Sequence, residues 1–428
     1  MSYAVSWTLA AMLLGAAAIR PAVAQSSRDE AVERYMAEIV WLAADERSGR
    51  GIGTDGLSEA GAWIEARFTE IGLAPSGSAG FRQSFSVSIP DPADPHSEGT
   101  RVDAFNVVGR LIAGSPNSLP GIIVIGAHYD HLGLGGPGSL DPDSHAIHNG
   151  ADDNASGTVA LIEAARILFD QRETLRRDIL FVAFSAEESG LIGSSAFVHS
   201  PPAGLDIHDI TAMLNMDMVG RLESDRLQVL GGDSAKEWKD IVEQHCERLT
   251  LDCVIQGDGF GSSDHSSFFA AGIPVLHFFT GAHAEYHRPS DDAHLVDVEG
   301  AVRIVRLVAA TALELADRKA ALTLVESTRP APIRMRIGGA RLGTIPDYAG
   351  PADGSPGLLL SAVRSESPAE QGGLQRGDLI VEMDGFEIRG IEDFMVVLSE
   401  ATPGTRAKVR VIRDGKAQEL EVTYGGSP

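Results

Sequence analysis

Four short runs of almost entirely apolar residues recur along the chain, and each run ends directly in a polar cluster. The runs span residues 121–127, 179–184, 211–216 and 273–279. Continuous apolar runs of this length are typical of strands that are buried on both faces of a parallel sheet. Helical patterns lie between them, such as the alanine-rich stretch 158–169. This alternation predicts an α/β fold in which helices flank a mostly parallel sheet.

The polar clusters supply the candidate ligands of a metal centre. Sheets of this kind bind ligands beyond the carboxyl ends of their strands, which is where the clusters lie. Two histidines with three carboxylates form a mixed nitrogen and oxygen set that suits zinc, with manganese or cobalt as alternatives. The candidate metal ligands are His128, Asp152, Glu188, Asp217 and His287.

Five groups exceed what a single tetrahedral zinc ion with an open position needs, so we expect two metals that share one carboxylate. Asp152 lies in the tight polar turn 150–157, just ahead of a buried helix, and is the best placed of the acids to bridge. His131 and the group 263–265 are expected to line the pocket or to support the ligands.

The residues beside the candidate ligands have the chemistry of a hydrolase. Water between two such metals becomes a hydroxide nucleophile near neutral pH. Glu187 precedes the ligand Glu188, and we expect it to act as the general base that passes the proton to the leaving amine. Asp130 is expected to orient the imidazole of His128, and Tyr286 to donate a hydrogen bond to the developing oxyanion.

The charge and the N-terminus restrict the partners and the location. The formal net charge is −25 and the pI is about 4.8. Nucleic acids and anionic membranes require basic patches, so both are excluded as partners. Residues 1–24 have the form of a secretory signal peptide, with a short apolar run and the cleavage pattern Ala22-Val23-Ala24. We expect a periplasmic or secreted protein without a membrane span after cleavage; the alternative is an uncleaved N-terminal anchor.

The two cysteines, Cys246 and Cys253, leave two alternatives open. In an exported protein they form a disulfide or stay as two buried thiols. Periodicity predicts further helices over 27–44, 58–71 and 298–324, and strands over 81–89 and 104–112. The proline-containing stretch 326–332 is the predicted linker, so we expect a large domain over 25–327 and a small one over 333–425.

Five motifs in this order form a specific combination. They are Gly126-Ala127-His128-Tyr129-Asp130-His131, Asn149-Gly150-Ala151-Asp152-Asp153-Asn154-Ala155-Ser156-Gly157, Ala186-Glu187-Glu188-Ser189-Gly190, Asn215-Met216-Asp217-Met218 and Tyr286-His287-Arg288-Pro289-Ser290-Asp291. Together they resemble the co-catalytic zinc aminopeptidase family, which includes bacterial leucyl aminopeptidase, aminopeptidase Y and glutamate carboxypeptidase. The resemblance covers roughly residues 27–320.

The resemblance implies a phosphorylase/hydrolase-like α/β sheet and two zinc ions per chain. By motif matching, Asp152 is the shared ligand, and Glu187 is the general base. The peptide bond between Asp152 and Asp153 resembles one that is cis in this family. Glutaminyl cyclases share the fold but use one zinc ion, and the retained His128 argues against that interpretation.

The C-terminal unit resembles a PDZ domain. Residues 367–385 carry the characteristic motif, 391–398 read as its helix, and 407–413 with 417–423 read as a hairpin. We expect the loop Leu342-Gly343-Thr344 to hold a peptide C-terminus through its backbone N–H groups. The alternative is a tethered structural lobe that has no peptide ligand.

The sequence therefore predicts an exported zinc aminopeptidase that hydrolyses N-terminal peptide bonds through a metal-bridged hydroxide. Two alternatives remain. One is a carboxypeptidase or dipeptidase on the same metal core. The other is a peptide-binding adaptor whose metal site is only structural.

Overall fold

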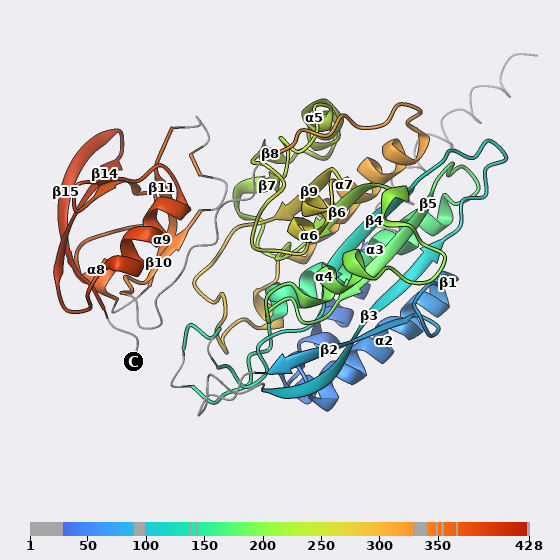
Figure 1. Cartoon of the computed structure of the whole chain (residues 1–428), viewed down its shortest axis with the longest axis horizontal. Helices are drawn as coiled ribbons and strands as arrows, with labels where there is room; N and C mark the ends of the chain where they lie inside the picture. Colours follow the sequence, from blue (N-terminus) through green and yellow to red (C-terminus); the bar gives the residue numbers. More distant parts are fainter. Residues whose placement is uncertain are drawn as a thin grey trace, which may run out of the picture.

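The computed structural model describes most of the chain, which forms two lobes (Figure 1). The described residues are 29–89, 99–136, 138–141, 144–327, 340–347, 350–351, 355–364 and 367–425. The predicted signal peptide, 1–24, and residues 328–332 of the predicted linker lie outside them. The domain boundaries proposed from the sequence stay predictions.

A nine-stranded sheet forms the middle of the first lobe, and helices cover both of its faces (Figure 1). The strand order is β1-β3-β5-β4-β6-β9-β7-β8, and β2 pairs with β3. The strands are β1 (Ala74–Pro75), β2 (Arg82–Ile89), β3 (Thr100–Leu111), β4 (Ile122–His128), β5 (Asp178–Phe184), β6 (Ile210–Met216), β7 (Arg226–Leu230), β8 (Asp252–Gln256) and β9 (Val275–Phe279).

The four strands predicted from the apolar runs lie side by side and parallel, in the order β5, β4, β6, β9. The edges of the sheet are different, because β3 runs antiparallel to β5 and β7 runs antiparallel to β9. The predicted fold class is confirmed, and the parallel pairing is concentrated in the centre of the sheet.

Alternate residues of β4 serve the two faces of the sheet, as strand geometry requires. Ile123 and Ile125 pack into the larger core with α3 and α7, whereas Val124 packs with phenylalanines of α4 and α6 on the other face. All seven residues of β4 are buried, which accounts for its continuous apolar run. The helices are α2 (Asp55–Ile71), α3 (Gly157–Asp170), α4 (Ile192–His199), α5 (Trp238–Leu249), α6 (His265–Ala270) and α7 (Val298–Asp317), preceded by helical residues 29–42.

Local signals fix the ends of these helices. The Thr54 side chain accepts a hydrogen bond from the Leu57 N–H at the start of α2, and Gly72 ends that helix with a φ of +97°. Helix α7 ends at Asp317, earlier than the predicted residue 324. The buried guanidinium of Arg177 donates to the carbonyl of Leu315, so it satisfies an acceptor that the end of the helix leaves free.

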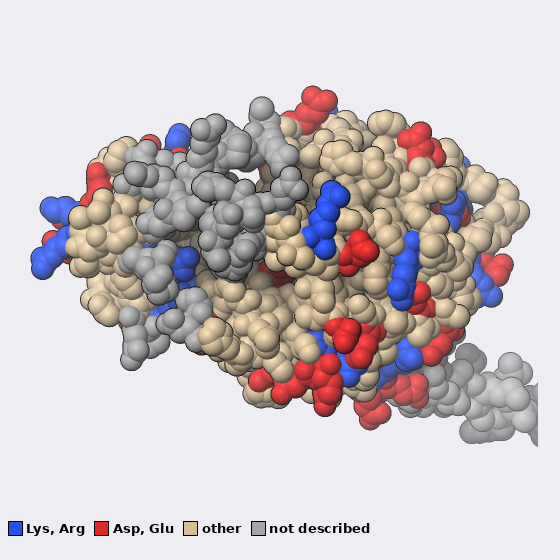
Figure 2. All heavy atoms as spheres, turned by 60° about the horizontal axis from the view of Figure 1, so that its bottom comes forward, with Lys and Arg blue, Asp and Glu red and all other residues tan. Residues whose placement is uncertain are grey.

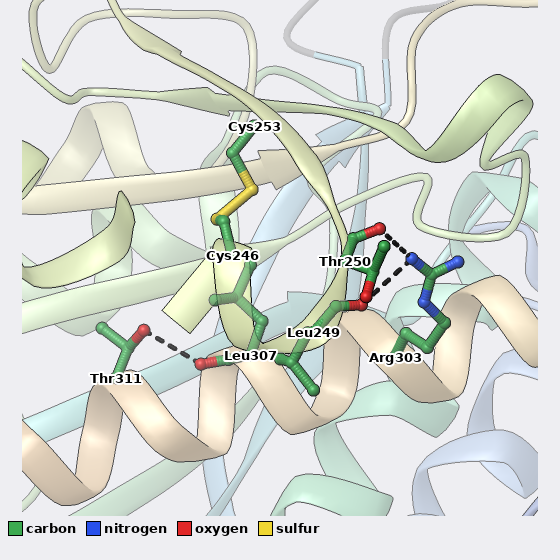
Figure 3. Close-up of a disulfide and its surroundings, with 7 residues drawn as sticks. All are labelled: Cys246, Leu249, Thr250, Cys253, Arg303, Leu307 and Thr311. Atoms are coloured by element: carbon green, nitrogen blue, oxygen red, sulfur yellow. Dashed lines mark hydrogen bonds between the residues drawn. A yellow bond between two sulfur atoms is a disulfide. The ribbon is translucent and has the colours of Figure 1, made fainter. Parts of the chain in front are cut away.

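The two cysteines form a disulfide that joins α5 to β8 (Figure 3). Their Cα atoms are 6.2 Å apart, which is within the usual range for a disulfide. Arg303 of α7 donates to the carbonyl oxygens of Leu249 and Thr250 in the turn between them (Figure 3). Of the two alternatives that the sequence left open, the structure has the disulfide. Helix α7 contacts the turn that this disulfide closes.

The second lobe is a small antiparallel sheet with its own hydrophobic core (Figure 1). The strand order is β10-β11-β12-β14-β15, and β13 pairs with β12. The predicted helix and hairpin are both present, as α9 and as β14 paired with β15. The elements are β10 (Thr344–Pro346), β11 (Leu358–Val363), α8 (Pro368–Gln371), β12 (Leu379–Met383), β13 (Phe386–Glu387), α9 (Ile391–Glu400), β14 (Arg406–Arg413) and β15 (Lys416–Thr423).

The surface reflects the acidic composition. On the face drawn in Figure 2, acidic side chains gather along one edge of the first lobe, with fewer basic side chains among them. Within the described ranges, no helix combines the length and the apolarity that a membrane crossing needs.

Candidate metal centre

The ends of the central strands bring most of the predicted site residues together. His128 is the last residue of β4, Glu187 and Glu188 follow β5, and Asp217 follows β6. His287 lies in the loop after β9. Parallel strands end at the same edge of a sheet, so residues that are far apart in the sequence meet at this edge.

Asp153 occupies the centre of this group. Its Oδ1 lies 3.4 Å from Nε2 of His128, and its Oδ2 lies 3.1 Å from Nε2 of His287. Asp217 completes one side, with Oδ1 3.2 Å from Nε2 of His128. Glu188 completes the other side, with Oε2 3.1 Å from Nε2 of His287. One carboxylate therefore faces both halves of the site.

The prediction that Asp152 bridges two metals is wrong. Asp152 points to the other side of the turn, where its Oδ1 accepts hydrogen bonds from the Gly220 N–H, at 2.6 Å, and the Ser156 hydroxyl, at 2.9 Å. Its Oδ2 lies 3.2 Å from Nε2 of His283. Adjacent side chains diverge in this turn, so only Asp153 can face the histidines of the site.

The expected cis peptide bond is also displaced by one residue, because it joins Asp153 to Asn154. The Asn154 side chain anchors this part of the turn. It donates to the Met216 carbonyl and accepts from the N–H groups of Gly157 and Met218.

Two buried charges hold the turn that presents Asp153. Arg50 donates to the carbonyl oxygens of Asn149 and Gly150 at 2.7 and 2.8 Å. Asp291 accepts from the N–H groups of Asp152 and Asp153 at 2.9 and 3.1 Å. The sequence analysis assigned neither residue a role in the site. The hydrogen bonds of both depend on contacts across the fold that no local pattern reveals.

Asp130 supports the site through the backbone. Its carboxylate accepts from the N–H groups of Glu187 and Glu188 at 3.1 and 3.3 Å. Nδ1 of His128 lies 3.2 Å from the main-chain carbonyl oxygen of Asp130 and 3.8 Å from its carboxylate. Burial raises the pKa of Asp130 to about 7. Asp130 thus lies beside His128 as predicted, although the carbonyl is the nearer acceptor.

Glu187 is a buried acid whose carboxylate forms no ion pair with the other described residues. Glu187, His128 and Asp217 form one candidate metal-binding group, because their possible ligand atoms lie within 4.8 Å of one another. Burial raises the pKa of Glu187 well above its usual range. Such a carboxyl group is suited to taking up and releasing a proton.

His131 is more closely involved than the sequence indicated. Its Nδ1 lies 2.8 Å from Oε1 of Glu188, and it forms a second group with Glu188 and Asp153 whose ligand atoms also lie within 4.8 Å of one another. Ser263 donates to Asp217 at 2.7 Å, so it supports a candidate ligand. Tyr286 stacks on His287 with 3.8 Å between ring centroids, and its predicted oxyanion role stays a prediction.

The residues of the site fit divalent cations. Asp153, Glu187, Glu188 and Asp217 lie together, and among the described residues histidines are the only basic side chains within ion-pair distance of them. Burial lowers the pKa of His287, but Glu188 and Asp153 outweigh burial and raise it to about 11. The acids therefore create a negative potential that draws protons onto the imidazoles. Divalent ions with nitrogen and oxygen ligands would satisfy the same charge.

The predicted peptide loop of the second lobe is formed, but its role stays a prediction. Leu342 is buried, Gly343 has a φ of +79°, and Thr344 begins β10. A Cβ on Gly343 would meet the Ser367 side chain at 2.5 Å, so this turn requires glycine.

Comparison with protein families identifies both lobes. Residues 106–312 match the family model of peptidase family M28, and residues 340–424 match that of the PDZ domain. The first lobe is thus similar to peptidase family M28, and the second lobe is similar to the PDZ domain.

Similar proteins agree with this assignment. Leucine aminopeptidase 1 of Sclerotinia sclerotiorum is 31% identical over 229 residues, which cover 49% of this chain and 56% of that protein. The chain thus spans about half the length of the curated relatives that it matches.

Two solved structures have the fold of the first lobe. The zinc aminopeptidase BSAP of Bacillus subtilis has a TM-score of 0.54 and 19% identity, and the match covers 69% of this chain and 98% of BSAP. Glutaminyl cyclase of Porphyromonas gingivalis has a TM-score of 0.52 and 20% identity, with 65% and 97% covered. Both likenesses show the fold alone, so the chemistry depends on the site.

Proposed function

We propose that this chain is an exported aminopeptidase that hydrolyses N-terminal peptide bonds with the help of two zinc ions. The observation that carries the proposal is the position of Asp153, which faces His128 through one carboxylate oxygen and His287 through the other. A relative named Leucine aminopeptidase 1 and a fold neighbour described as a zinc aminopeptidase support the activity and the metal.

The ligand set follows from the two halves of the site. His128 and Asp217 would hold one ion, Glu188 and His287 would hold the other, and Asp153 would be shared. Two bound ions would polarise the scissile carbonyl and lower the pKa of the attacking water. Asp152 has no part in this set.

Glu187 is the proposed general base. The Asp130 carboxylate holds its main chain, so the Glu187 side chain is fixed beside His128 and Asp217 without being tied up in an ion pair. It would take the proton of the attacking water and deliver it to the amine of the leaving residue. Tyr286, stacked on His287, is the proposed donor to the oxygen that gains negative charge.

The choice between an aminopeptidase and a carboxypeptidase depends on where positive charge is available. Arg221 lies near the site, but it is 3.3 Å from Asp291 and 3.9 Å from Glu285. These two acids neutralise it, so it is a poor receptor for a terminal carboxylate at the metals. The excess of acidic side chains at the candidate metal centre supports binding of a substrate that has a free, positively charged amine instead.

Export is proposed on two observations. The N-terminal residues have the form of a signal peptide, and Cys246 forms a disulfide with Cys253. Disulfides persist mainly in oxidising compartments such as the periplasm or the exterior of the cell.

The test is a substrate panel. Zinc-loaded protein would be given leucine, alanine, lysine and glutamate arylamides, together with N-blocked peptides that have a free C-terminus; chelated protein serves as the control. We expect chelator-sensitive cleavage of the free-amine substrates alone. Cleavage of the blocked peptides would establish a carboxypeptidase instead, and no cleavage of either would favour the peptide-binding adaptor.

A further inference from the structure

Three arginines lie near enough to interact electrostatically, where the PDZ domain contacts the loop beside the candidate metal centre. Arg288 directly follows His287, whereas Arg341 and Arg364 belong to the PDZ domain. Among the described residues, no carboxylate lies within ion-pair distance of any of the three. In a chain with a net charge of −25, a group of unpaired arginines needs a physical reason.

Hydrogen bonds connect Arg364 to the candidate metal centre. Its guanidinium lies 3.5 Å from the carbonyl oxygen of Leu140. The N–H of Leu140 donates to the main-chain carbonyl of His287 at 2.9 Å. Nδ1 of His287 lies 2.8 Å from the carbonyl oxygen of Gly138 in the same loop. Arg364 therefore touches the loop that holds a candidate metal ligand.

Arg364 also touches the predicted peptide loop of the PDZ domain. Its N–H donates to the carbonyl of Gly343 at 2.9 Å. The same residue thus links the PDZ loop to the loop that carries Leu140 beside the metal centre.

Two of these arginines each keep a side-chain donor without a partner among the described residues. The Nε atoms of Arg288 and Arg364 are both shielded from solvent, and neither has a hydrogen-bond partner. Burial first, and then the charges of Arg288 and Arg341, lower the pKa of Arg364. Shielded guanidinium donors with like charges nearby would be stabilised by an anion, and a carboxylate matches the fork of donors on an arginine.

We propose that Arg288 and Arg364, with Arg341 at the rim, bind the free C-terminal carboxylate of a short peptide whose amino end lies at the metal centre. This inference rests on the proposed aminopeptidase function and names its substrate class. Because Arg288 directly follows the candidate ligand His287 and a peptide spans at most about 3.5 Å per residue, the substrates would be short peptides. The PDZ domain would then complete the substrate site of the peptidase.

The experiment compares matched substrates in the full-length, zinc-loaded protein. Tripeptides with an N-terminal leucine are supplied as the free acid and as the C-terminal amide, and leucine arylamide serves as a substrate without a carboxylate. For the wild type we expect kcat/KM to be at least about tenfold higher for the acid than for the amide, mainly through KM, since only the acid forms charge-assisted hydrogen bonds with the guanidinium groups.

Arginine variants test the assignment. Arg288→Met and Arg364→Met should lose the preference for the free acid while they keep arylamide hydrolysis, and Arg364→Lys should restore part of it. Arg376→Met is the matched control. Arg376 also reaches from the PDZ domain to the peptidase domain, where it pairs with Glu223 at 2.7 Å, but it lies outside the cluster. Its preference should equal that of the wild type.

Direct binding separates this proposal from the proposed function. N-acetylated tripeptide acids and amides are titrated into the same proteins by calorimetry. If no substrate is hydrolysed, the aminopeptidase proposal fails, but acid-selective binding that Arg288→Met abolishes would still support the carboxylate site. If the wild type hydrolyses and binds the peptide acid and the peptide amide equally well, the proposed carboxylate site is overturned. Acid-selective binding of long blocked peptides alone would assign the arginines to a PDZ ligand and also overturn the substrate role.

Discussion

Two groups of buried acids lie on opposite sides of the turn 151–156, and the protein satisfies them in different ways. On one side, Asp152 and Asp291 are paired with Arg221, with His283 and with backbone N–H groups. On the other side is the acid cluster, defined as Asp153, Glu187, Glu188 and Asp217, whose ion-pair partners among the described residues are histidines.

The comparison teaches how to separate structural acids from functional ones. A buried carboxylate costs free energy unless a partner compensates its charge. The paired group has its compensation within the chain, so it shapes the turn. Within the described part of the chain, the acid cluster has no arginine or lysine in ion-pair contact, so we propose that a bound cation compensates its charge. The same reasoning applies to two arginines. Arg221 is neutralised by Asp291 and Glu285, whereas Arg288 has no acidic partner among the described residues.

The largest effect should come from Glu187. Glu187→Gln keeps the volume of the side chain but removes the proton acceptor, so we expect kcat to fall by about 10²–10⁴-fold with the metal content unchanged. Steady-state kinetics on leucine arylamide measure this. Glu285→Gln is the matched control, because Glu285 lies beside His283 and Arg221, and its kcat should stay within a few fold. A Glu187→Gln enzyme that retains more than a tenth of wild-type kcat would remove Glu187 from the mechanism.

Sequence reasoning predicted the sheet centre well, since β4, β5, β6 and β9 are long apolar runs with both faces covered. It predicted the edge strands less well. For example, β7 and β8 are only five residues each, and neither has a strong apolar or alternating pattern.

The site was predicted as a set of residue types but not in all its positions. His128 ends β4, Asp217 directly follows β6, and Glu188 and His287 lie in the loops after β5 and β9, so the strand prediction indicated the edge of the sheet where they lie. Asp152 and Asp153 are adjacent in a turn, and only its backbone, which Arg50 and Asp291 hold from distant segments, decides which acid faces the histidines. The roles of Arg50 and Asp291 in the site could not be read from their own surroundings in the sequence.

Substitutions in the group that contains Asp152 and Asp291 should lower the stability of the fold more than they lower catalysis. Asp291→Ala leaves Arg221 and two backbone N–H groups without their acceptor, so we expect the free energy of unfolding to fall by about 3 kcal/mol. Urea denaturation of metal-loaded protein measures it. The neighbouring Asp292→Ala, which loses one hydrogen bond from Asn149, should cost about 1 kcal/mol. Equal losses for the two variants would contradict the account of Asp291.

A smaller effect concerns His265, a buried histidine outside both groups. Burial lowers its pKa to about 3, and it stacks on His277 with 4.5 Å between ring centroids. The folded state keeps it neutral, whereas the unfolded state gains a proton below a pH of about 6.5. Stability is therefore retained above about pH 6.5 and lost as the pH falls toward 3, at about 1.4 kcal/mol per pH unit.

The pH dependence of unfolding tests this directly. Between pH 6 and pH 4.5, His265→Leu should lose less stability than the wild type, by about 1.4 kcal/mol per pH unit. Exposed His199→Leu should follow the wild type. A His265→Leu curve parallel to that of the wild type would show that His265 is not held neutral by the fold.

The central claim is that Asp153, which faces His128 and His287, holds metal and that Asp152, on the other side of the turn, does not. Its most direct test is the metal content of purified wild type, Asp153→Asn and Asp152→Asn, measured by mass spectrometry against protein concentration after zinc loading and dialysis. The account predicts about two ions per chain in the wild type and in Asp152→Asn, and a loss of most metal in Asp153→Asn. Metal retained in Asp153→Asn but lost in Asp152→Asn, or well under one ion per chain in active wild type, would contradict it.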